Sequence, residues 1–163
     1  MDFLVFSDSH GRTSGMREAL SRNARVDAVF FLGDGLRDVG EVAPLTNAPW
    51  ISVRGNCDSP RLTLDACEEE SLCFEGHRIL LVHGHTYGVK SGLGALIARA
   101  KAGGYDIVLY GHTHEPSLTC ITEGDRPIYL FCPGSIGLPN AGAPCFGHLH
   151  LDEKNVLLSH GTV

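Results

Sequence analysis

The stretch from Phe3 to Gly11 reads FLVFSDSHG, an apolar run that ends abruptly in polar residues and a glycine. A continuous rather than alternating run of apolar residues is typical of a strand that is buried on both faces. Such strands belong to sheets that are covered on both sides, so this stretch favours an α/β protein. Asp8 and His10 follow at the point where the strand would end.

The same arrangement recurs along the chain, because later apolar runs also stop at short polar segments rich in glycine. These runs are 28–32 before Gly33-Asp34, 50–53 before Gly55-Asn56-Cys57-Asp58, 79–82 before His83-Gly84-His85, and 107–110 before Gly111-His112-Thr113-His114. Apolar spacing predicts helices over 14–23 and 93–102. The sequence after residue 117 predicts four further strands, over 118–122, 128–132, 146–151 and 155–159. We expect one domain over residues 1–163, with two mixed β-sheets packed as an α/β sandwich and helices on the outer faces.

Composition and charge disfavour several classes of function. The 163 residues carry a net charge of −6, which disfavours stable binding to nucleic acid. The sequence has no apolar stretch of the roughly 18 residues needed to span a membrane, and its start lacks the features of a signal peptide, so we expect a cytoplasmic protein. The six cysteines form no Cys-x-x-Cys pair, which predicts reduced and mostly buried thiols. A disulfide between Cys120 and Cys132 across a hairpin is the disfavoured alternative.

Ligands of open α/β sheets bind beyond the carboxyl ends of the strands, where the polar segments lie. The candidate metal ligands there are Asp8, His10, Asp34, Asn56, His83, His112 and His114, and Cys57 and His85 lie beside them in the sequence. Oxygen and nitrogen donors suit manganese, with iron, zinc, nickel, cobalt or magnesium as alternatives. Seven donors suit two divalent ions about 3.5–4 Å apart that share one carboxylate.

The order Asp-x-His, Gly-Asp, Gly-Asn-x-Asp, His-Gly-His and Gly-His-Thr-His over residues 8–114 resembles the calcineurin-like metallophosphoesterases. It is most similar to their small single-domain bacterial and archaeal phosphodiesterases, and residues 131–135 resemble the Asn-Pro-Gly-Ser element of that branch. The resemblance implies a first ion held by Asp8, His10, Asp34 and His114, and a second held by Asp34, Asn56, His83 and His112. It also implies a phosphodiesterase in which a metal-bridging hydroxide attacks the phosphorus of a small phosphate ester.

Three positions depart from the family pattern. Cys57 stands where many relatives have a histidine that helps to protonate the leaving oxygen, Cys132 replaces an asparagine, and Asn140 replaces an arginine. Besides the metal ligands, the predicted catalytic residues are Asn56, Cys57, Asp58 and His85, and the predicted substrate-binding residues are Asn56, His85 and Asn140.

Two other functions stay open: a phosphomonoesterase, and a non-catalytic protein-assembly scaffold like the retromer subunit that has this fold. A scaffold need not keep seven ligands, which favours catalysis. We interpret His77, His148, His150 and His160 as ordinary hydrogen-bonded residues, although His148-x-His150 has the spacing of a ligand pair. The run 65–70 is predicted to be a solvated acidic loop or helix. A homo-oligomer is possible.

Overall fold

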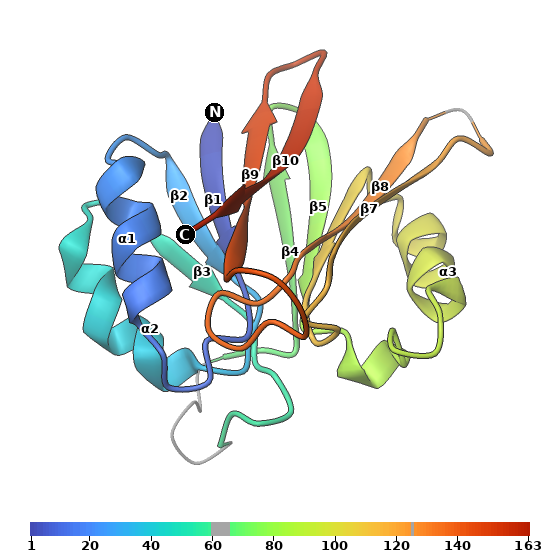
Figure 1. Ribbon diagram of the computed structural model, residues 1–163. Helices are drawn as coiled ribbons and strands as arrows, with labels where there is room; N and C mark the ends of the chain where they lie inside the picture. The colour runs from blue at the N-terminus through green and yellow to red at the C-terminus, as the bar shows by residue number, and fades with distance from the viewer. Residues whose placement is uncertain (60–65, 125) are drawn as a thin grey trace.

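The structure, a computed structural model, describes residues 1–59, 66–124 and 126–163. Two five-stranded mixed sheets face each other (Figure 1). In the first sheet β1, β2 and β3 are parallel, and β9 and β10 continue it antiparallel, in the order β10-β9-β1-β2-β3. The bounds of these strands are Asp2–Phe6 (β1), Ala28–Phe31 (β2), Trp50–Ser52 (β3), Cys145–Leu151 (β9) and Val156–Thr162 (β10).

The second sheet has the order β4-β5-β6-β8-β7, with a parallel centre and two antiparallel edge strands. Its strands are β4 (Glu69–Phe74), β5 (His77–Val82), β6 (Ile107–Tyr110), β7 (Pro116–Ile121) and β8 (Ile128–Pro133). The two sheets confirm the predicted sandwich.

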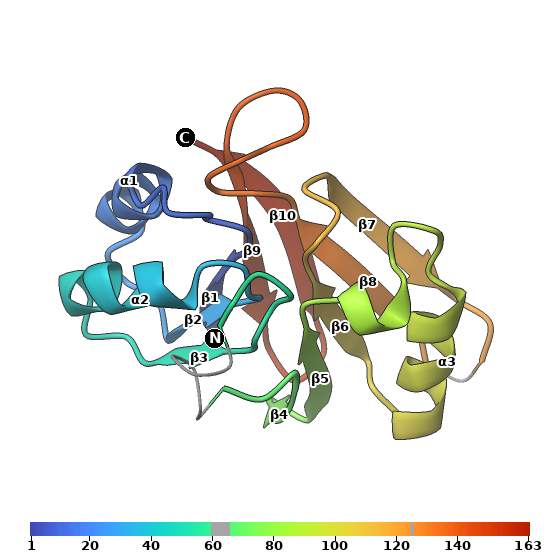
Figure 2. The ribbon, with the colours of Figure 1, turned by 90° about the horizontal axis from the view of Figure 1, so that it is seen from below.

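Helices cover the outer faces, as predicted. Figure 2 shows α1 (Ser14–Arg22) and α2 (Leu36–Val42) beside the first sheet and α3 (Gly94–Gly103) beside the second. Two 3-10 turns follow α2 and β5, namely η1 (Ala43–Leu45) and η2 (His85–Tyr87). No helix in the described parts of the chain is long and apolar enough to cross a membrane.

Burial on both faces accounts for the continuous apolar runs. Phe3 and Val5 point between the sheets, where the ring of Phe3 stacks on that of Phe30 with centroids 4.9 Å apart. Leu4 and Phe6 point the opposite way and pack with residues of α1. The second sheet shows the same burial on both faces. Alternate residues of β5 join the core between the sheets and the core beneath α3.

Three expectations need correction. Residues 66–68 of the run 65–70 form the predicted loop, but Glu69 and Glu70 begin the edge strand β4, and Asp65 lies outside the described residues. The strand forms because a tight turn at Glu75-Gly76, where both φ angles are positive, folds it back onto β5. Helix α2 is not among the elements predicted from the sequence. All six cysteines are free as predicted, but only Cys132 and Cys145 are buried, and Cys73 and Cys120 lie exposed on edge strands.

Candidate metal centre

The loops after β1, β2, β3, β5 and β6 lie at one end of the sandwich, which faces the viewer in Figure 2. They bring the predicted metal ligands together in two groups. In the first, Asp8, His10 and His114 place their donor atoms within 4.8 Å of one another, and in the second Asp34, His83 and His112 do the same. A third set, which contains His10, Asp34 and Cys57, links the two groups.

The backbone of these loops is unusual. Six non-glycine residues in the described chain have positive φ, and all but Glu75 are candidate ligands: Asp8 (56°), His10 (47°), Asp34 (59°), His112 (69°) and His114 (61°). Positive φ is uncommon outside glycine, although Asp and His tolerate it better than most residues. Such backbone strain concentrates at functional sites, where the surrounding structure imposes it.

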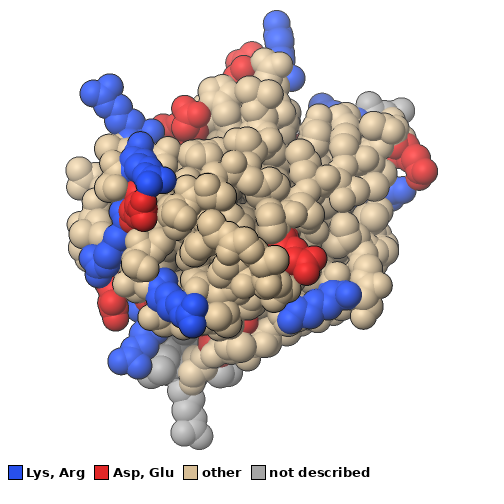
Figure 3. All heavy atoms as spheres, viewed as in Figure 1, with Lys and Arg blue, Asp and Glu red and all other residues tan. Residues whose placement is uncertain are grey.

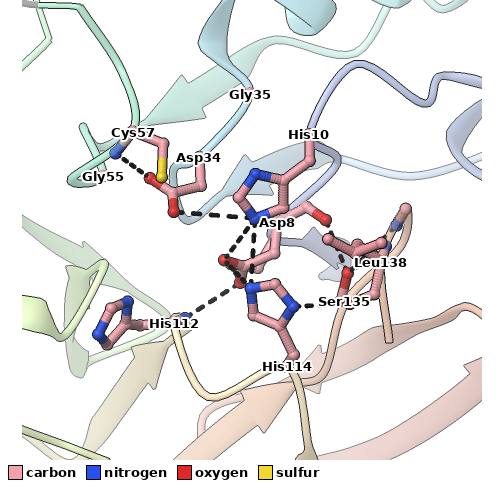
Figure 4. A network of polar contacts seen from close by, with 12 residues as sticks. Asp8, His10, Asp34, Gly35, Gly55, Cys57, His112, His114, Ser135 and Leu138 are labelled. Carbon is pink, nitrogen blue, oxygen red and sulfur yellow. Dashed lines mark hydrogen bonds and ion pairs between the residues drawn. The ribbon is translucent and has the colours of Figure 1, made fainter. Parts of the chain in front are cut away.

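In the first group, three donor atoms converge on one point (Figure 4). Asp8 Oδ1 lies 3.2 Å from His114 Nε2 and 3.7 Å from His10 Nε2, and the two ring nitrogens are 3.2 Å apart. Asp8 Oδ1 is buried and has no hydrogen-bond partner in the described part of the chain. A buried carboxylate oxygen without a donor is costly unless a cation satisfies it, so this oxygen and its two imidazoles fit a metal ion.

In the second group, Asp34 occupies the position between the two clusters. Its Oδ2 lies 3.4 Å from His83 Nε2 and 3.8 Å from His10 Nε2. Asn56 joins this group through its Oδ1, which lies 3.1 Å from His83 Nε2. The oxygen and nitrogen donors here also suit a divalent ion.

Two of the imidazoles are oriented by backbone carbonyls. His83 Nδ1 donates to the carbonyl of Leu32 (2.7 Å), and His114 Nδ1 donates to that of Leu138 (2.6 Å). Each bond fixes the tautomer and leaves Nε2 free of a proton in the neutral ring, aimed into the site. This is the arrangement that metal-binding histidines commonly have.

Asp58 holds the loop that carries Asp34. Its two carboxylate oxygens accept hydrogen bonds from the backbone N–H groups of Asp34, Gly35, Leu36 and Gly55, at 2.8–2.9 Å. Both oxygens of Asp58 are thus engaged in positioning the backbone, and the catalytic role expected of Asp58 stays a prediction.

Two further polar side chains, which were not predicted from the sequence, brace the loop after β1. Ser135 Oγ donates to the backbone oxygen of Asp8 (2.7 Å), and Asp38 Oδ2 accepts from Ser9 Oγ and Gly11 N. Each has a sequence signal: Ser135 ends the stretch 131–135 that resembles the Asn-Pro-Gly-Ser element, and Asp38 is an acidic residue in the first turn of α2.

The electrostatics keep the carboxylates ionised. Burial alone would raise the pKa of Asp8, but the neighbouring imidazoles of His10 and His114 lower it well below its usual range. For Asp34, burial is likewise outweighed, chiefly by His83, and the pKa falls to about 2. The same contacts raise the pKa of His114, through Asp8, and of His83, where Asp34 outweighs burial. Burial and the neighbouring His83 lower the pKa of His112 to about 4.

The remaining predicted site residues are Cys57, His85 and Asn140, which lie at the rim of the metal centre. The backbone N–H of Cys57 donates to Asp34 Oδ1 (2.7 Å), and burial together with Asp34 raises the pKa of its thiol to about 11. The half-buried ring of His85 lies 5.4 Å from that of His83, between centroids. Asn140 is exposed, and its Nδ2 donates to Thr113 O (2.9 Å) and Glu115 Oε1 (3.3 Å). The amide of Asn140 therefore braces the loop of His112 and His114.

Ordinary hydrogen bonds are predicted for the four histidines outside this centre, and the structure confirms them for three. His77 and His160 bond backbone carbonyls, and His150 bonds Asp2 Oδ1. His148 packs against Phe146.

The fold, the ordered motifs and the converging donors point to a known group of hydrolases. The model of the calcineurin-like phosphoesterase superfamily domain matches residues 1–154. The chain belongs to this superfamily. Members similar to it include the probable metallophosphoesterase YsnB of Bacillus subtilis, which is 33% identical over 140 residues, or 85% of this chain and 77% of the relative. The phosphodiesterase MJ0936 of Methanocaldococcus jannaschii is 29% identical over 165 residues, which cover 92% and 93% of the two chains.

A solved structure supports the same membership. The predicted phosphoesterase from Streptococcus pneumoniae superposes with a TM-score of 0.80 at 28% identity, covering 99% of this chain and 88% of the other. The superfamily thus accounts for the sandwich fold.

Proposed function

We propose that this metal-dependent phosphoesterase is a phosphodiesterase that holds two divalent ions, with manganese as the ion used. The observation that carries the proposal is the position of Asp34 Oδ2, which lies 3.4 Å from His83 and 3.8 Å from His10. A carboxylate shared between two donor groups is the arrangement expected of a site for two ions about 3.5–4 Å apart. When bound, the ions supply a hydroxide nucleophile at neutral pH and offset charge on the phosphoryl oxygens.

In this proposal Asp8, His10 and His114 hold the first ion and Asn56, His83 and His112 hold the second, with Asp34 common to both. Asn56 is exposed and His85 is half-buried beside His83, and in this proposal each contacts a phosphoryl oxygen. The strained ligand backbone favours catalysis over a scaffold role, because a scaffold has no need of five ligands held at positive φ.

Two features of the rim favour diesters over alkyl monoesters. The amide of Asn140 braces a loop and offers no bidentate cation for a phosphate dianion. Protonation of an alkoxide leaving group needs a stronger acid than the neutral thiol that Cys57 provides. A diester carries a single negative charge and an aryloxide leaves without full protonation, so the site suits an aryl diester.

The test compares kcat/KM for an aryl diester and an alkyl monoester on one manganese-loaded sample, with a chelator-treated sample as the blank. We expect the diester to be preferred by roughly ten- to a hundredfold, the value of a lost charged contact. A monoester preference of tenfold or more would make the protein a phosphomonoesterase with another leaving-group acid, His85 being the candidate.

Cys57→Ser separates the two possible roles of the thiol. Because the nucleophile in this proposal is not sulfur, the variant should keep substantial diester turnover with unchanged metal content. Complete loss of turnover with the metal retained would favour covalent thiol chemistry instead.

A further inference from the structure

A groove of about 300 Å³ opens beside the metal centre. One side of its lining belongs to the centre itself, with His10, Asp34 and Cys57. Arg37 and Ser59 also line it, and they lie outside the predicted set of site residues. The groove therefore runs from the candidate ligands to the side chain of Arg37, which has no role in the fold described above.

The acidic groups of this groove are already engaged. Asp58 accepts four backbone N–H groups, Asp38 accepts Ser9 Oγ and Gly11 N, and Asp34 Oδ1 accepts Cys57 N. Each carboxylate thus has donors other than Arg37.

Arg37 differs from other arginines near the site. It is exposed and makes no hydrogen bond or ion pair with any residue that the structure describes. Arg12 donates to the carbonyl of Gly137, and Arg54 pairs with Glu68. Arginine stays charged at any ordinary pH, so Arg37 brings to the groove a guanidinium that no carboxylate of the described chain pairs with.

The backbone that carries Arg37 is held in place. Asp58 binds the N–H groups of Gly35 and Leu36, and Gly35 has a φ of 148°. A Cβ at residue 35 would lie 1.9 Å from Ser9 Oγ, so the two loops pack too closely for a side chain there. Arg37 therefore starts from a fixed point three residues after Asp34, while its guanidinium is free to meet a ligand.

We propose that Arg37 binds a second anionic group of the substrate and so selects phosphodiesters that carry a carboxylate or another phosphate beside the scissile group. This inference rests on the proposed function. Planar guanidinium groups bind both kinds of anion through paired N–H donors. Figure 3 shows several Lys and Arg side chains over the side of the molecule that α1 and α2 occupy, which would add a general attraction for anions.

The test measures binding, so it does not depend on turnover. The probes are methyl(phenyl)phosphinate and methyl(4-carboxyphenyl)phosphinate, whose phosphorus group carries a single negative charge like that of a diester and has no ester bond to cleave, and their Kd values are measured by calorimetry on the manganese-loaded protein. We expect the carboxylated probe to bind more tightly, and Arg37→Gln to weaken it by about three- to tenfold while changing the uncarboxylated probe less. Arg37→Lys should keep part of the preference.

Arg25→Gln is the matched control, because Arg25 is also exposed, has no described partner and precedes β2 at the opposite end of the strand from Asp34. It should leave both Kd values unchanged. The proposal is overturned if the wild type has no preference, if neither probe binds, or if Arg37→Gln keeps the full preference. A preference that depends on Arg37 in a protein that cleaves no aryl diester would uphold this inference and reject the proposed function.

Discussion

His112-Thr113-His114 and His148-Leu149-His150 share the same spacing but have opposite environments. The first pair follows β6 in a loop where both histidines have positive φ, and its rings join two groups that contain Asp8 and Asp34. The second pair lies within the regular strand β9, opposite Leu4 and Asp2 of β1. There His150 bonds Asp2 Oδ1 at 2.7 Å, and the ring of His148 lies 4.9 Å from that of Phe146.

The difference teaches that spacing alone does not make a metal ligand. Both patterns place two imidazoles on one side of the chain, yet only the first meets carboxylates brought by other strand ends. The second meets one exposed carboxylate across a strand pair and one aromatic ring. The site forms because loops from several strands converge there. The i, i+2 spacing of two histidines does not form it.

Asp34→Asn should give the largest effect, because it removes the carboxylate nearest to both donor groups while keeping the acceptor for Cys57 N. We expect diester turnover to fall by more than about a hundredfold, beyond the usual cost of losing a residue that merely orients a ligand. Asp2→Asn is the control, since it removes the carboxylate beside His150 and should leave turnover unchanged. Near-normal activity in Asp34→Asn would refute a shared ligand.

Alanine substitutions of the two histidine pairs should differ in metal content. His114→Ala should lose one of two ions, because His83, Asn56 and Asp34 still hold the other, whereas His150→Ala should keep both. Elemental analysis of protein purified without chelator measures this. Equal metal loss in the two variants would contradict the claim that His114 is a metal ligand and His150 is not.

The smallest effect is a pH dependence of the metal-free protein. The raised pKa values of His83 and His114 stabilise the fold below their unfolded value of about 6.5, and this stabilisation disappears as the pH rises through the folded values. The lowered pKa values of Asp8 and Asp34 stabilise it above about 3.9, and that contribution is lost as the pH falls through the folded values.

The lowered pKa of His112 acts against His83 and His114 between about pH 6.5 and 4. With chelator present, Tm should therefore fall most steeply below about pH 4, where the carboxylates of Asp8 and Asp34 are protonated. Divalent ions compete with the protons on these imidazoles, so added manganese should raise Tm more at pH 8 than at pH 5. A manganese effect that is larger at pH 5 would contradict this assignment of the histidines.

The sandwich could be predicted from the sequence because strands such as 3–6 and 79–82 are apolar on both faces, as strands covered on both sides must be. Helix α2 could not, because its start depends on Asp58, which lies more than twenty residues away and offers no local signal. Strand β4 was missed because a half-exposed edge strand alternates weakly and its acidic start resembles a loop.

The same limit applies to the site. Strand ends followed by Asp, Asn and His predicted which donors would be near one another, and the structure brings these donors together. It also shows what no local pattern contains: the positive φ of Asp8 and Asp34, the four N–H groups on Asp58, and the groove beside Arg37. Each depends on contacts between loops that are distant in sequence.

The central claim is that the His112 end of the sandwich holds two ions that share Asp34. Crystals of the manganese-loaded protein, measured for anomalous scattering, test it most directly. We expect two peaks about 3.5–4 Å apart, one among Asp8, His10 and His114 and one among Asn56, His83 and His112, with Asp34 between them. A single peak at this end, or an occupied site at His148 and His150, would contradict it.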